Sequence, residues 1–507
     1  MTEHMNMLFL MTDQHRVDTL GCYGNPRART PNLDALAAGG TRLDANFTPS
    51  AICTPARASL ATGVLPFRHG LLANYERNVG YPEELSDEFT PFSQQLREAG
   101  YNVGLQGKWH VGKMRGPEEF GFDGPHYPGW HNPITLPEYR AWLAERGLPE
   151  PVISEEVRGT FPNGEPGNLL AGTLEQPAEA TFEHFLTDRT IEQLERYATD
   201  FHGTGRPFFM ATHFFGPHLP YLLPREYLEM HDPEAIELPA SAAETFENKP
   251  TVQQRYSEHW THDTLDPHTR RWLIAAYWGY VKLIDEQVGR LLDTLKRLGL
   301  WDLTAVSFTA DHGEFTGAHR LHDKGPAMYD DIYRIPGIWR VPGAPQDNVC
   351  EDFTSLVDFT ATILDLASVQ ADPEADGRSL LPLIHAEEPV EWRQDITAEF
   401  HGHHFPYPQR MLRTRTHKLI INPESINELY DLANDPHELH NRYSDPDYRE
   451  IRDGLLHRLY EQLRKRGDNF HHWMTSMYPV GGKGYDTSLS DFEGESHQEE
   501  AVVGPEK

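Results

Sequence analysis

The chain has 507 residues, and its 77 Asp and Glu outnumber its 45 Lys and Arg, which gives a formal net charge of −32 at pH 7. Nucleic acid and anionic membranes repel such an acidic chain, so we expect neither as a partner. The length exceeds what one hydrophobic core usually supports and predicts a large domain with a smaller one. The three cysteines, Cys22, Cys53 and Cys350, do not indicate a disulfide framework.

The start of the chain, residues 1–11, has no basic region, and its apolar run is too short for a secretion signal. No later segment reaches the roughly 20 apolar residues that a membrane span needs. We therefore expect a cytoplasmic protein without a membrane partner. The composition leaves a homo-oligomer open.

Short apolar runs alternate with amphipathic stretches along much of the chain. The run Asn6–Thr12 is nearly continuous in apolar residues, which is typical of a strand buried on both faces. The same criteria predict further strands and helices. The strands are Asn6–Thr12 and residues 101–105, 207–215 and 304–309, and the helices are residues 31–39, 90–100, 181–199, 271–298 and 355–366.

Two later regions have a different pattern. Residues 116–172 are rich in Pro, Gly and aromatics without clear periodicity, which predicts a long loop region over the active face. Nearer the C-terminus, short strands at hairpin spacing precede one helix, which predicts a small antiparallel sheet with a covering helix. The strands are residues 395–400, 411–414, His417–Ile421 and 429–432, and the helix is residues 447–466.

These changes of pattern predict three parts of the chain. We expect a catalytic α/β domain over residues 1–385 and a C-terminal subdomain of antiparallel sheet and helix over 386–475. Residues 476–507 are polar and Gly-rich and are expected to form a tail.

Polar side chains follow the ends of the predicted strands. Each one alone is more often a turn residue, a helix cap or a surface side chain. In open α/β sheets, however, ligands bind beyond the C-terminal ends of the strands, so this shared placement indicates one site. The residues are Asp13, Gln14, Lys108, His218, Asp311 and His312.

Cys53 stands just before a predicted helix, in which Thr54 is the N-cap, Pro55 the first helical residue and Gly63 the stop. Unpaired amide groups and the helix dipole attract anions to such a position. By itself, an intracellular cysteine is usually a small buried apolar residue. The local pattern therefore offers a reactive position but names no reaction.

The sequence Cys-Thr-Pro-Ala-Arg at residues 53–57 resembles the Cys-x-Pro-x-Arg signature of the formylglycine-dependent sulfatases of the alkaline phosphatase superfamily. In that family the cysteine is oxidised to an aldehyde, and the hydrate of the aldehyde is the nucleophile. Further matches follow in family order: the pair Asp13-Gln14, Gly-Lys-x-His at residues 107–110, Gly-Pro-His at 216–218, Asp-His-Gly at 311–313 and Leu-Tyr-Asp-Leu at 429–432.

The resemblance implies an α/β fold with a large mixed, mostly parallel sheet sandwiched by helices. It also implies a smaller C-terminal α+β subdomain that contains an antiparallel sheet. A divalent metal would lie beside the formylglycine at Cys53, held by Asp13, Gln14, Asp311 and His312. Calcium prefers oxygen ligands, whereas an imidazole shifts the preference towards transition ions, so we expect Ca²⁺ and keep Mn²⁺ open.

The resemblance also assigns catalytic roles. Arg57 would hold the formylglycine hydroxyl, and Lys108 would contact the sulfate and the nucleophile oxygen. His110 would bind the hydrate and take a proton when the intermediate collapses. His218 and Lys324 would act at the leaving oxygen, and Lys324 would also bind sulfate.

The outer substrate contacts are expected from loops that are rich in aromatic and histidine residues. His401 and Arg410 are the predicted substrate-binding residues there. Aromatic and histidine side chains in such loops more often pack than recognise a ligand. Further candidates for the lining are Trp109, Tyr127, Trp130, His131, His403 and His404.

The implied activity is that of a sulfuric ester hydrolase, which cleaves a small organic sulfate ester to an alcohol and sulfate. One hydroxyl of the hydrate attacks sulfur and expels the alcohol, and the second then drives out sulfate. A formylglycine-generating enzyme would be a partner during maturation. One alternative is a phosphonate monoester or phosphodiester hydrolase of the same superfamily, and another is a noncatalytic sulfate-ester binding protein. Sugar, aryl and alkyl sulfates all remain candidate substrates.

Overall fold

Strand β1 (Asn6–Thr12) lies within a large mixed sheet in the computed structural model, which describes residues 5–77, 79–127, 133–387, 391–423, 425–470, 474 and 477. Among these residues the sheet has seven strands in the order β10-β2-β9-β8-β1-β6-β3. All of them run parallel except β9. The other bounds are β2 Thr41–Phe47, β3 Asn102–Gly107, β6 Phe208–His213, β8 Thr304–Ala310, β9 Gly337–Arg340 and β10 Asn348–Ser355. The predicted large, mostly parallel sheet is confirmed.

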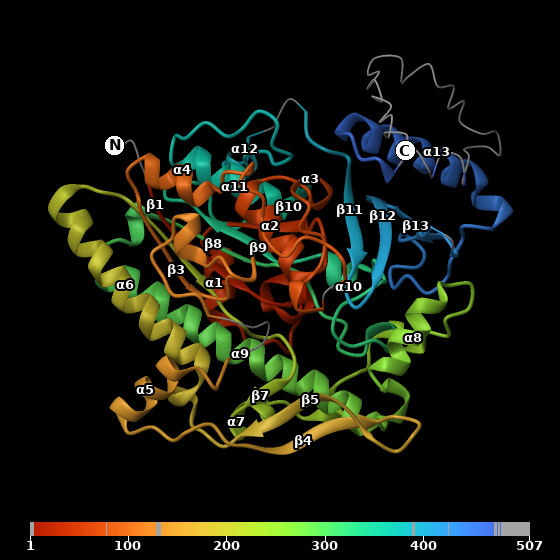
Figure 1. Ribbon diagram of the computed structural model, residues 1–507, viewed down its shortest axis with the longest axis horizontal. Coiled ribbons are helices and arrows are strands. Elements are labelled where there is room, and N and C mark those ends of the chain that lie inside the picture. Colours follow the sequence, from red (N-terminus) through yellow and green to blue (C-terminus); the bar gives the residue numbers. More distant parts are fainter. Residues whose placement is uncertain are drawn as a thin grey trace, which may run out of the picture. The chain divides into compact units, whose positions relative to one another are not determined.

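Helices cover both faces of this sheet (Figure 1). Alternate residues of β1 point to opposite faces. Leu8 and Leu10 pack in one cluster with α1, α6 and α9, whereas Met7, Phe9 and Met11 pack in the other with α2, α4 and α11. Burial on both faces explains the unbroken apolar run. The bounds are α1 Pro31–Ala38, α6 Phe182–Thr204 and α9 Pro267–Arg297 on the first face, and α2 Cys53–Thr62, α4 Phe92–Glu98 and α11 Leu356–Leu366 on the second.

Shorter helices lie in the connections. They are α3 Pro66–His69, α7 Arg225–Leu228, α8 Thr251–His259, α10 Asp330–Tyr333 and α12 Leu381–Ile384. Among the described residues, none of the helices combines the length and the apolarity that a membrane span requires.

The prediction of a long loop over residues 116–172 is wrong. That region contains helix α5 (Pro137–Arg146) and strands β4 (Ile153–Thr160) and β5 (Pro166–Leu174), which form a three-stranded sheet with β7 (Tyr221–Leu223). Strand β4 is mostly half-buried or exposed and therefore carries few apolar residues. The sequence patterns also did not predict strands β2, β9 and β10. Strand β2 has no continuous apolar pattern, because Arg42 and Asp44 form an ion pair within it.

The predicted antiparallel sheet is confirmed and has the order β11-β12-β13-β14. Its strands are β11 Asp395–Gly402, β12 Pro406–Thr414, β13 His417–Ile421 and β14 Glu428–Asp431. The chain forms two compact units, Met1–Asn441, which includes this sheet, and Arg442–Lys507, which includes α13 (Arg449–Arg466). The domain boundaries at 385 and 475 stay predictions, and apart from residue 477 the predicted tail lies outside the described residues.

The register of the strands brings their C-terminal ends to one level. Thr12 of β1 pairs with Ala310 of β8, and Met11 pairs with His213 of β6. Gly107, the last residue of β3, also pairs with His213. The residues that follow these strands must therefore meet at one edge of the sheet.

Gly107 has a conformation and a packing that other residues cannot adopt without strain. Its φ is 111°, and an added Cβ would lie 1.9 Å from the carbonyl oxygen of His213. Gly100 also has a positive φ, 91°, but has open space around the same position. Gly107 thus sets how closely β3 approaches β6 directly before Lys108.

We expect Gly107→Ala to lower the free energy of unfolding by about 3 kcal/mol or more, and Gly100→Ala by only about 1 kcal/mol. The first substitution adds a clash with backbone to the strain of a positive φ, whereas the second adds the strain alone. Urea unfolding followed by circular dichroism measures both. Equal losses would show that the close approach of β3 and β6 is unimportant.

Candidate active site

Cys53 is the first residue of helix α2 and is fully buried. The N-cap is Ile52 in extended conformation, so the helix begins earlier than predicted and Thr54 is not its N-cap. The amide of Thr54 instead donates to Oδ1 of Asn74 at 3.0 Å, which satisfies one free amide of the first turn. Gly63 ends the helix with φ 76°, as predicted.

Arg57, one turn further along α2, joins the ends of two strands. Its Nη2 is 2.9 Å from Oδ2 of Asp13, and its Nε is 2.8 Å from Oδ2 of Asp311. Its Nη1 donates to the carbonyl oxygen of Lys108 at 2.8 Å. Lys108 Nζ lies 2.8 Å from the same Asp13 oxygen. Two buried aspartates are thus balanced by two buried cations.

The charges around Cys53 favour an anion. Burial alone would raise the pKa of the thiol, but Lys108, Lys324 and His312 hold it well below its ordinary range. Burial and the Asp13 carboxylate raise the pKa of Asp311 to about 6 in spite of Arg57. The two carboxylates therefore crowd each other, and a further cation between them would relieve this repulsion.

A set of metal-binding atoms surrounds the Cys53 position. Ligand atoms of Asp13, Cys53, Asp311 and His312 all lie within 4.8 Å of one another. Nδ1 of His312 donates to the carbonyl oxygen of Gly313 at 2.8 Å, which leaves Nε2 facing Cys53 Sγ at 3.2 Å. Such a backbone contact orients metal-binding histidines. Two carboxylates and one oriented imidazole fit a divalent cation.

The Gln14 side chain is held by Glu314 and Lys324, and its predicted place among the metal ligands stays a prediction. The amide nitrogen donates to the carboxylate of Glu314, so Oε1 faces Lys324 Nζ at 3.0 Å. Glu314 also accepts from the amide of Asp323 at 2.6 Å, and burial raises the pKa of Glu314 to about 7. The sequence analysis did not single out Glu314. The one signal was its place in the Asp-His-Gly-Glu run that begins at Asp311.

Lys324 and His218 lie in contact with each other, and both are buried. Lys324 Nζ is 2.7 Å from Nε2 of His218 and 3.1 Å from Oδ1 of Asp323. Nδ1 of His218 donates to the carbonyl oxygen of Leu219, so Nε2 accepts from Lys324. Burial and the Lys324 charge lower the pKa of His218, which keeps the ring neutral.

His110 is held in place by a carboxylate. Its Nε2 lies 2.7 Å from Oε1 of Glu76, and Tyr75 packs edge-on against its ring with centroids 4.9 Å apart. His110 is one of the groups that lower the pKa of Cys53. Neither Glu76 nor Asn74 was predicted, because nothing in their local sequence marks them.

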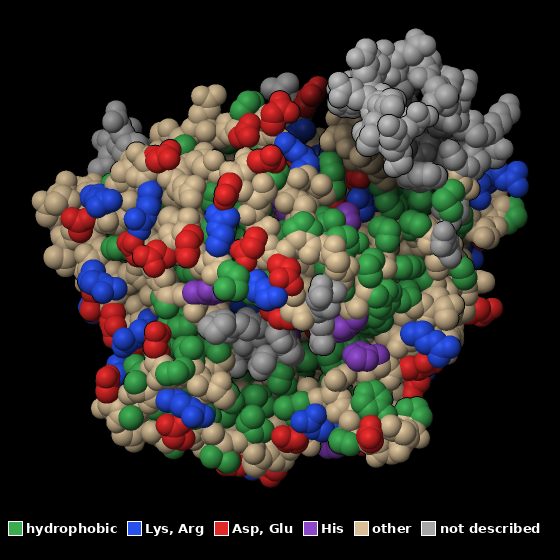
Figure 2. All heavy atoms as spheres, in the orientation of Figure 1, with side chains coloured by type: hydrophobic (Ala, Val, Ile, Leu, Met, Phe, Trp, Pro, Cys, Tyr) green, Lys and Arg blue, Asp and Glu red, His purple; other side chains and the backbone are tan. Residues whose placement is uncertain are grey.

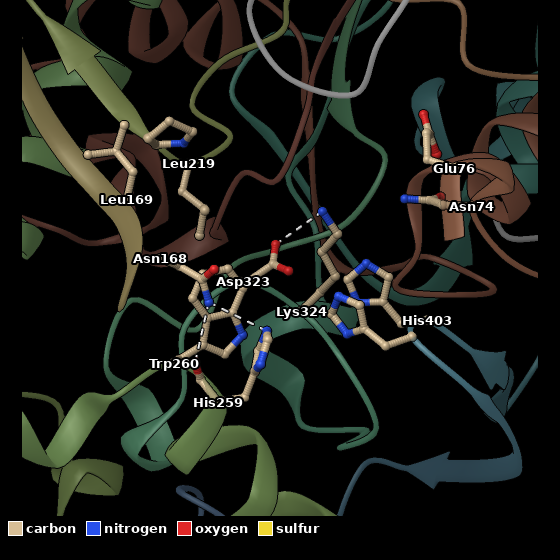
Figure 3. Close-up of a pocket in the computed structure, with 12 residues that line it drawn as sticks. Asn74, Glu76, Asn168, Leu169, Leu219, His259, Trp260, Asp323, Lys324 and His403 are labelled. Carbon is tan, nitrogen blue, oxygen red and sulfur yellow. Dashed lines mark hydrogen bonds and ion pairs between the residues drawn. The ribbon is translucent and has the colours of Figure 1, made fainter. Parts of the chain in front are cut away.

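A cavity of about 550 Å³ opens beside Lys324 (Figure 3). Figure 3 shows Asn74 and Glu76 on one side of Lys324 and Asn168, His259 and Trp260 on the other. On the face drawn in Figure 2, basic and acidic side chains are interspersed. The lysine in the cavity lining is the buried Lys324. The lining is Asn74, Glu76, Asn168, Leu169, Leu219, Pro220, His259, Trp260, Asp323, Lys324, His403 and His404.

His401 and Arg410 do not line this cavity. Nε2 of His401 is 2.8 Å from Oε2 of Glu399, and Nη2 of Arg410 is 3.9 Å from the same oxygen. Their substrate-binding roles stay predictions. Of the other candidates for the lining, His403 and His404 are part of it.

The remaining candidates for the lining lie elsewhere. Trp109 packs against Phe120, and Tyr127 packs against Phe182 and Phe185. Both aromatic side chains are buried and contribute to packing. The other two candidates, Trp130 and His131, lie outside the described residues.

This fold and this site define a hydrolase of the alkaline phosphatase superfamily, with a buried cysteine near a pair of carboxylates and two lysines. The Sulfatase family profile matches residues 5–369, and the profile of the C-terminal part of N-sulphoglucosamine sulphohydrolase matches residues 317–466. The chain therefore belongs to the sulfatase family and is a sulfuric ester hydrolase.

Similar proteins cover nearly the whole chain. An uncharacterized sulfatase, YidJ, of Escherichia coli K12 is 29% identical over 494 residues, which is 94% of this chain and 90% of that protein. The N-acetylglucosamine-6-O-sulfatase of Bacteroides thetaiotaomicron is 27% identical, with 92% and 88% covered. The crystal structure of the phosphonate monoester hydrolase of Agrobacterium radiobacter has a TM-score of 0.76 at 25% identity, with 91% and 96% covered.

We expect Arg57→Gln to lower the free energy of unfolding by about 3–5 kcal/mol, because it leaves the buried carboxylates of Asp13 and Asp311 without their shared partner. Arg255→Gln is the control, since Arg255 forms an exposed ion pair with Glu258 and its loss should be hardly measurable. Urea unfolding gives both values. Similar losses for the two variants would contradict the bridging role of Arg57.

Proposed function

We propose that this sulfatase hydrolyses a small organic sulfate ester to an alcohol and sulfate, with Cys53 converted to formylglycine. We further propose that Asp13, Gln14, Asp311 and His312 hold one divalent cation, Ca²⁺. The observation that carries the proposal is the place of Cys53, at a helix start within reach of Asp13, Asp311 and His312 and near two buried lysines, Lys108 and Lys324. The sulfatase relatives support it.

When present, the aldehyde hydrate supplies the attacking hydroxyl and the cation withdraws negative charge from the sulfate group. Lys108 and Lys324 bind the sulfate oxygens, which are anionic and need buried cations in a dry site. Lys324 also shares a hydrogen bond with neutral His218, and the pair can deliver a proton to the departing alcohol oxygen. This assigns the leaving-group side of the site to Lys324 and His218.

His110 serves the other side of the site. It would bind the hydrate at Cys53 and take a proton when the intermediate collapses, and the Glu76 carboxylate orients the ring. Arg57 contacts Asp13 and Asp311 rather than the cavity, so its part is to position the two carboxylates and α2. Its predicted contact with the hydroxyl at Cys53 stays a prediction.

The conversion of Cys53 requires a formylglycine-generating enzyme as partner, and a cytoplasmic location remains part of the proposal. Mass spectrometry of the peptide that contains Cys53, from protein made in its own host, reports the conversion directly. An unmodified thiol in active protein would overturn the mechanism at its first step.

A phosphonate monoester hydrolase is the second candidate, because the Agrobacterium radiobacter enzyme of that name shares the fold over 91% of this chain. We expect the kcat/KM for 4-nitrophenyl sulfate to be higher than the kcat/KM for 4-nitrophenyl phenylphosphonate. Cys53→Ala should lower both rates by at least about 10³-fold and leave the melting temperature nearly unchanged. A strong preference for the phosphonate would replace the proposed function with this alternative, and unchanged rates in Cys53→Ala would refute the nucleophile.

Removal of the cation should destabilise the protein. We expect EDTA to lower the melting temperature and abolish turnover, because the carboxylates of Asp13 and Asp311 then repel each other again. Ca²⁺ should restore both better than Mn²⁺, and elemental analysis should find one ion per chain. In Asp311→Asn, which lacks one of the two carboxylates, EDTA should change the melting temperature much less than in the wild type. An unchanged melting temperature in metal-free protein would contradict the site.

A further inference from the structure

Two buried nitrogen atoms in the cavity wall have no hydrogen-bond partner among the described residues. They are Nε1 of Trp260 and Nδ1 of His403, and each side chain is only 6% exposed. A buried polar group without a partner destabilises the protein, because it has lost its hydrogen bonds to water. Buried nitrogens that face a cavity therefore point to a ligand with oxygen atoms at matching places.

The two residues come from different parts of the fold. Trp260 directly follows helix α8, and His403 lies in the turn between β11 and β12. Figure 3 shows His403 beside Lys324, and Trp260 with Asn168 and His259 on the other side of Asp323. Both side chains therefore border the cavity into which Lys324 also projects.

The chemistry of the two nitrogens limits what they bind. The indole Nε1 of Trp260 is a donor only. Burial, with help from His404 and Lys324, lowers the pKa of His403 well below its ordinary value, so its ring is neutral and Nδ1 can donate or accept. Both therefore suit hydroxyl groups, which offer lone pairs and a proton, and neither is satisfied by a hydrocarbon.

Two other buried indoles show that an unpartnered Nε1 is not enough by itself. Trp142 and Trp339 also lack a partner at Nε1 but belong to packed clusters and do not line the cavity. Trp260 differs because its side chain borders a cavity of about 550 Å³, which has room for more than a sulfate group.

On the basis of the proposed function, we infer that the alcohol part of the substrate is a hydroxyl-bearing ring, a sugar. Trp260 and His403 are the residues that select it: Nε1 of Trp260 donates to one substrate oxygen, and Nδ1 of His403 bonds a second hydroxyl. An alcohol without hydroxyls would leave both nitrogens unpaired, and sites built to bind a hydroxyl strongly reject analogues that lack it.

The test compares sulfates that differ only in hydroxyls. D-glucose, D-galactose and N-acetyl-D-glucosamine 6-sulfates are the sugar probes, and cyclohexylmethyl sulfate has the same ring size and a primary alkyl leaving group without hydroxyls. The wild type should favour the best sugar by at least about 100-fold in kcat/KM. Trp260→Phe and His403→Phe should each lower this ratio by about tenfold or more.

The matched control is Trp142→Phe, which makes the same substitution at a buried indole away from the cavity and should leave the ratio unchanged. Wild-type enzyme that cleaves cyclohexylmethyl sulfate as well as the best sugar would overturn the inference, and so would an unchanged ratio in both cavity variants. If either variant fails to fold, the wild-type preference alone decides. Wild-type enzyme that cleaves 4-nitrophenyl phenylphosphonate and no sulfate would overturn the proposed function itself.

Discussion

The site depends on two aspartates that cannot move apart. Strands β1 and β8 are parallel and in register, so Asp13 and Asp311 follow adjacent backbone positions at one edge of the sheet. Oxygen atoms of the two buried carboxylates lie within 4.8 Å of each other, and such a pair is stable only with cations close by. Arg57 supplies one and thereby fixes helix α2 against the strand ends, which places Cys53 at its first residue beside both aspartates.

The same charge balance explains how a chain with a net charge of −32 can bind an anion. Lys108 and Lys324 are buried, and their field acts at short range in a low-dielectric site, whereas surface charges are screened by solvent and salt. Glu314 links two loops, because its carboxylate accepts from the Gln14 side-chain amide and from the backbone amide of Asp323, directly before Lys324. A change in the loop after β1 therefore also affects the loop that carries Lys324.

The residues that carry the chemistry were predictable because each follows a core strand or belongs to a long signature. Asp13, Asp311 and Lys108 lie together because the strands before them end at one level. The central strands could be predicted because each is a continuous apolar run. Strand β4 was missed because much of it is exposed and its composition resembles a loop. Glu76 and Asn74 were missed because their importance arises only when their loop meets Cys53 and His110.

The histidines of the β11–β12 hairpin show most clearly what cannot be predicted from local sequence. His401 lies within β11 and is held by Glu399, whereas His403 lies in the turn and borders the cavity. Positions two apart in a hairpin differ in surroundings that no local pattern reports. The sequence by itself determined the family and the polar groups that follow the strand ends, since these depend on local patterns. Only the tertiary structure decided the cavity wall, because Asn168, Trp260 and His403 meet there through contacts between segments far apart in the chain.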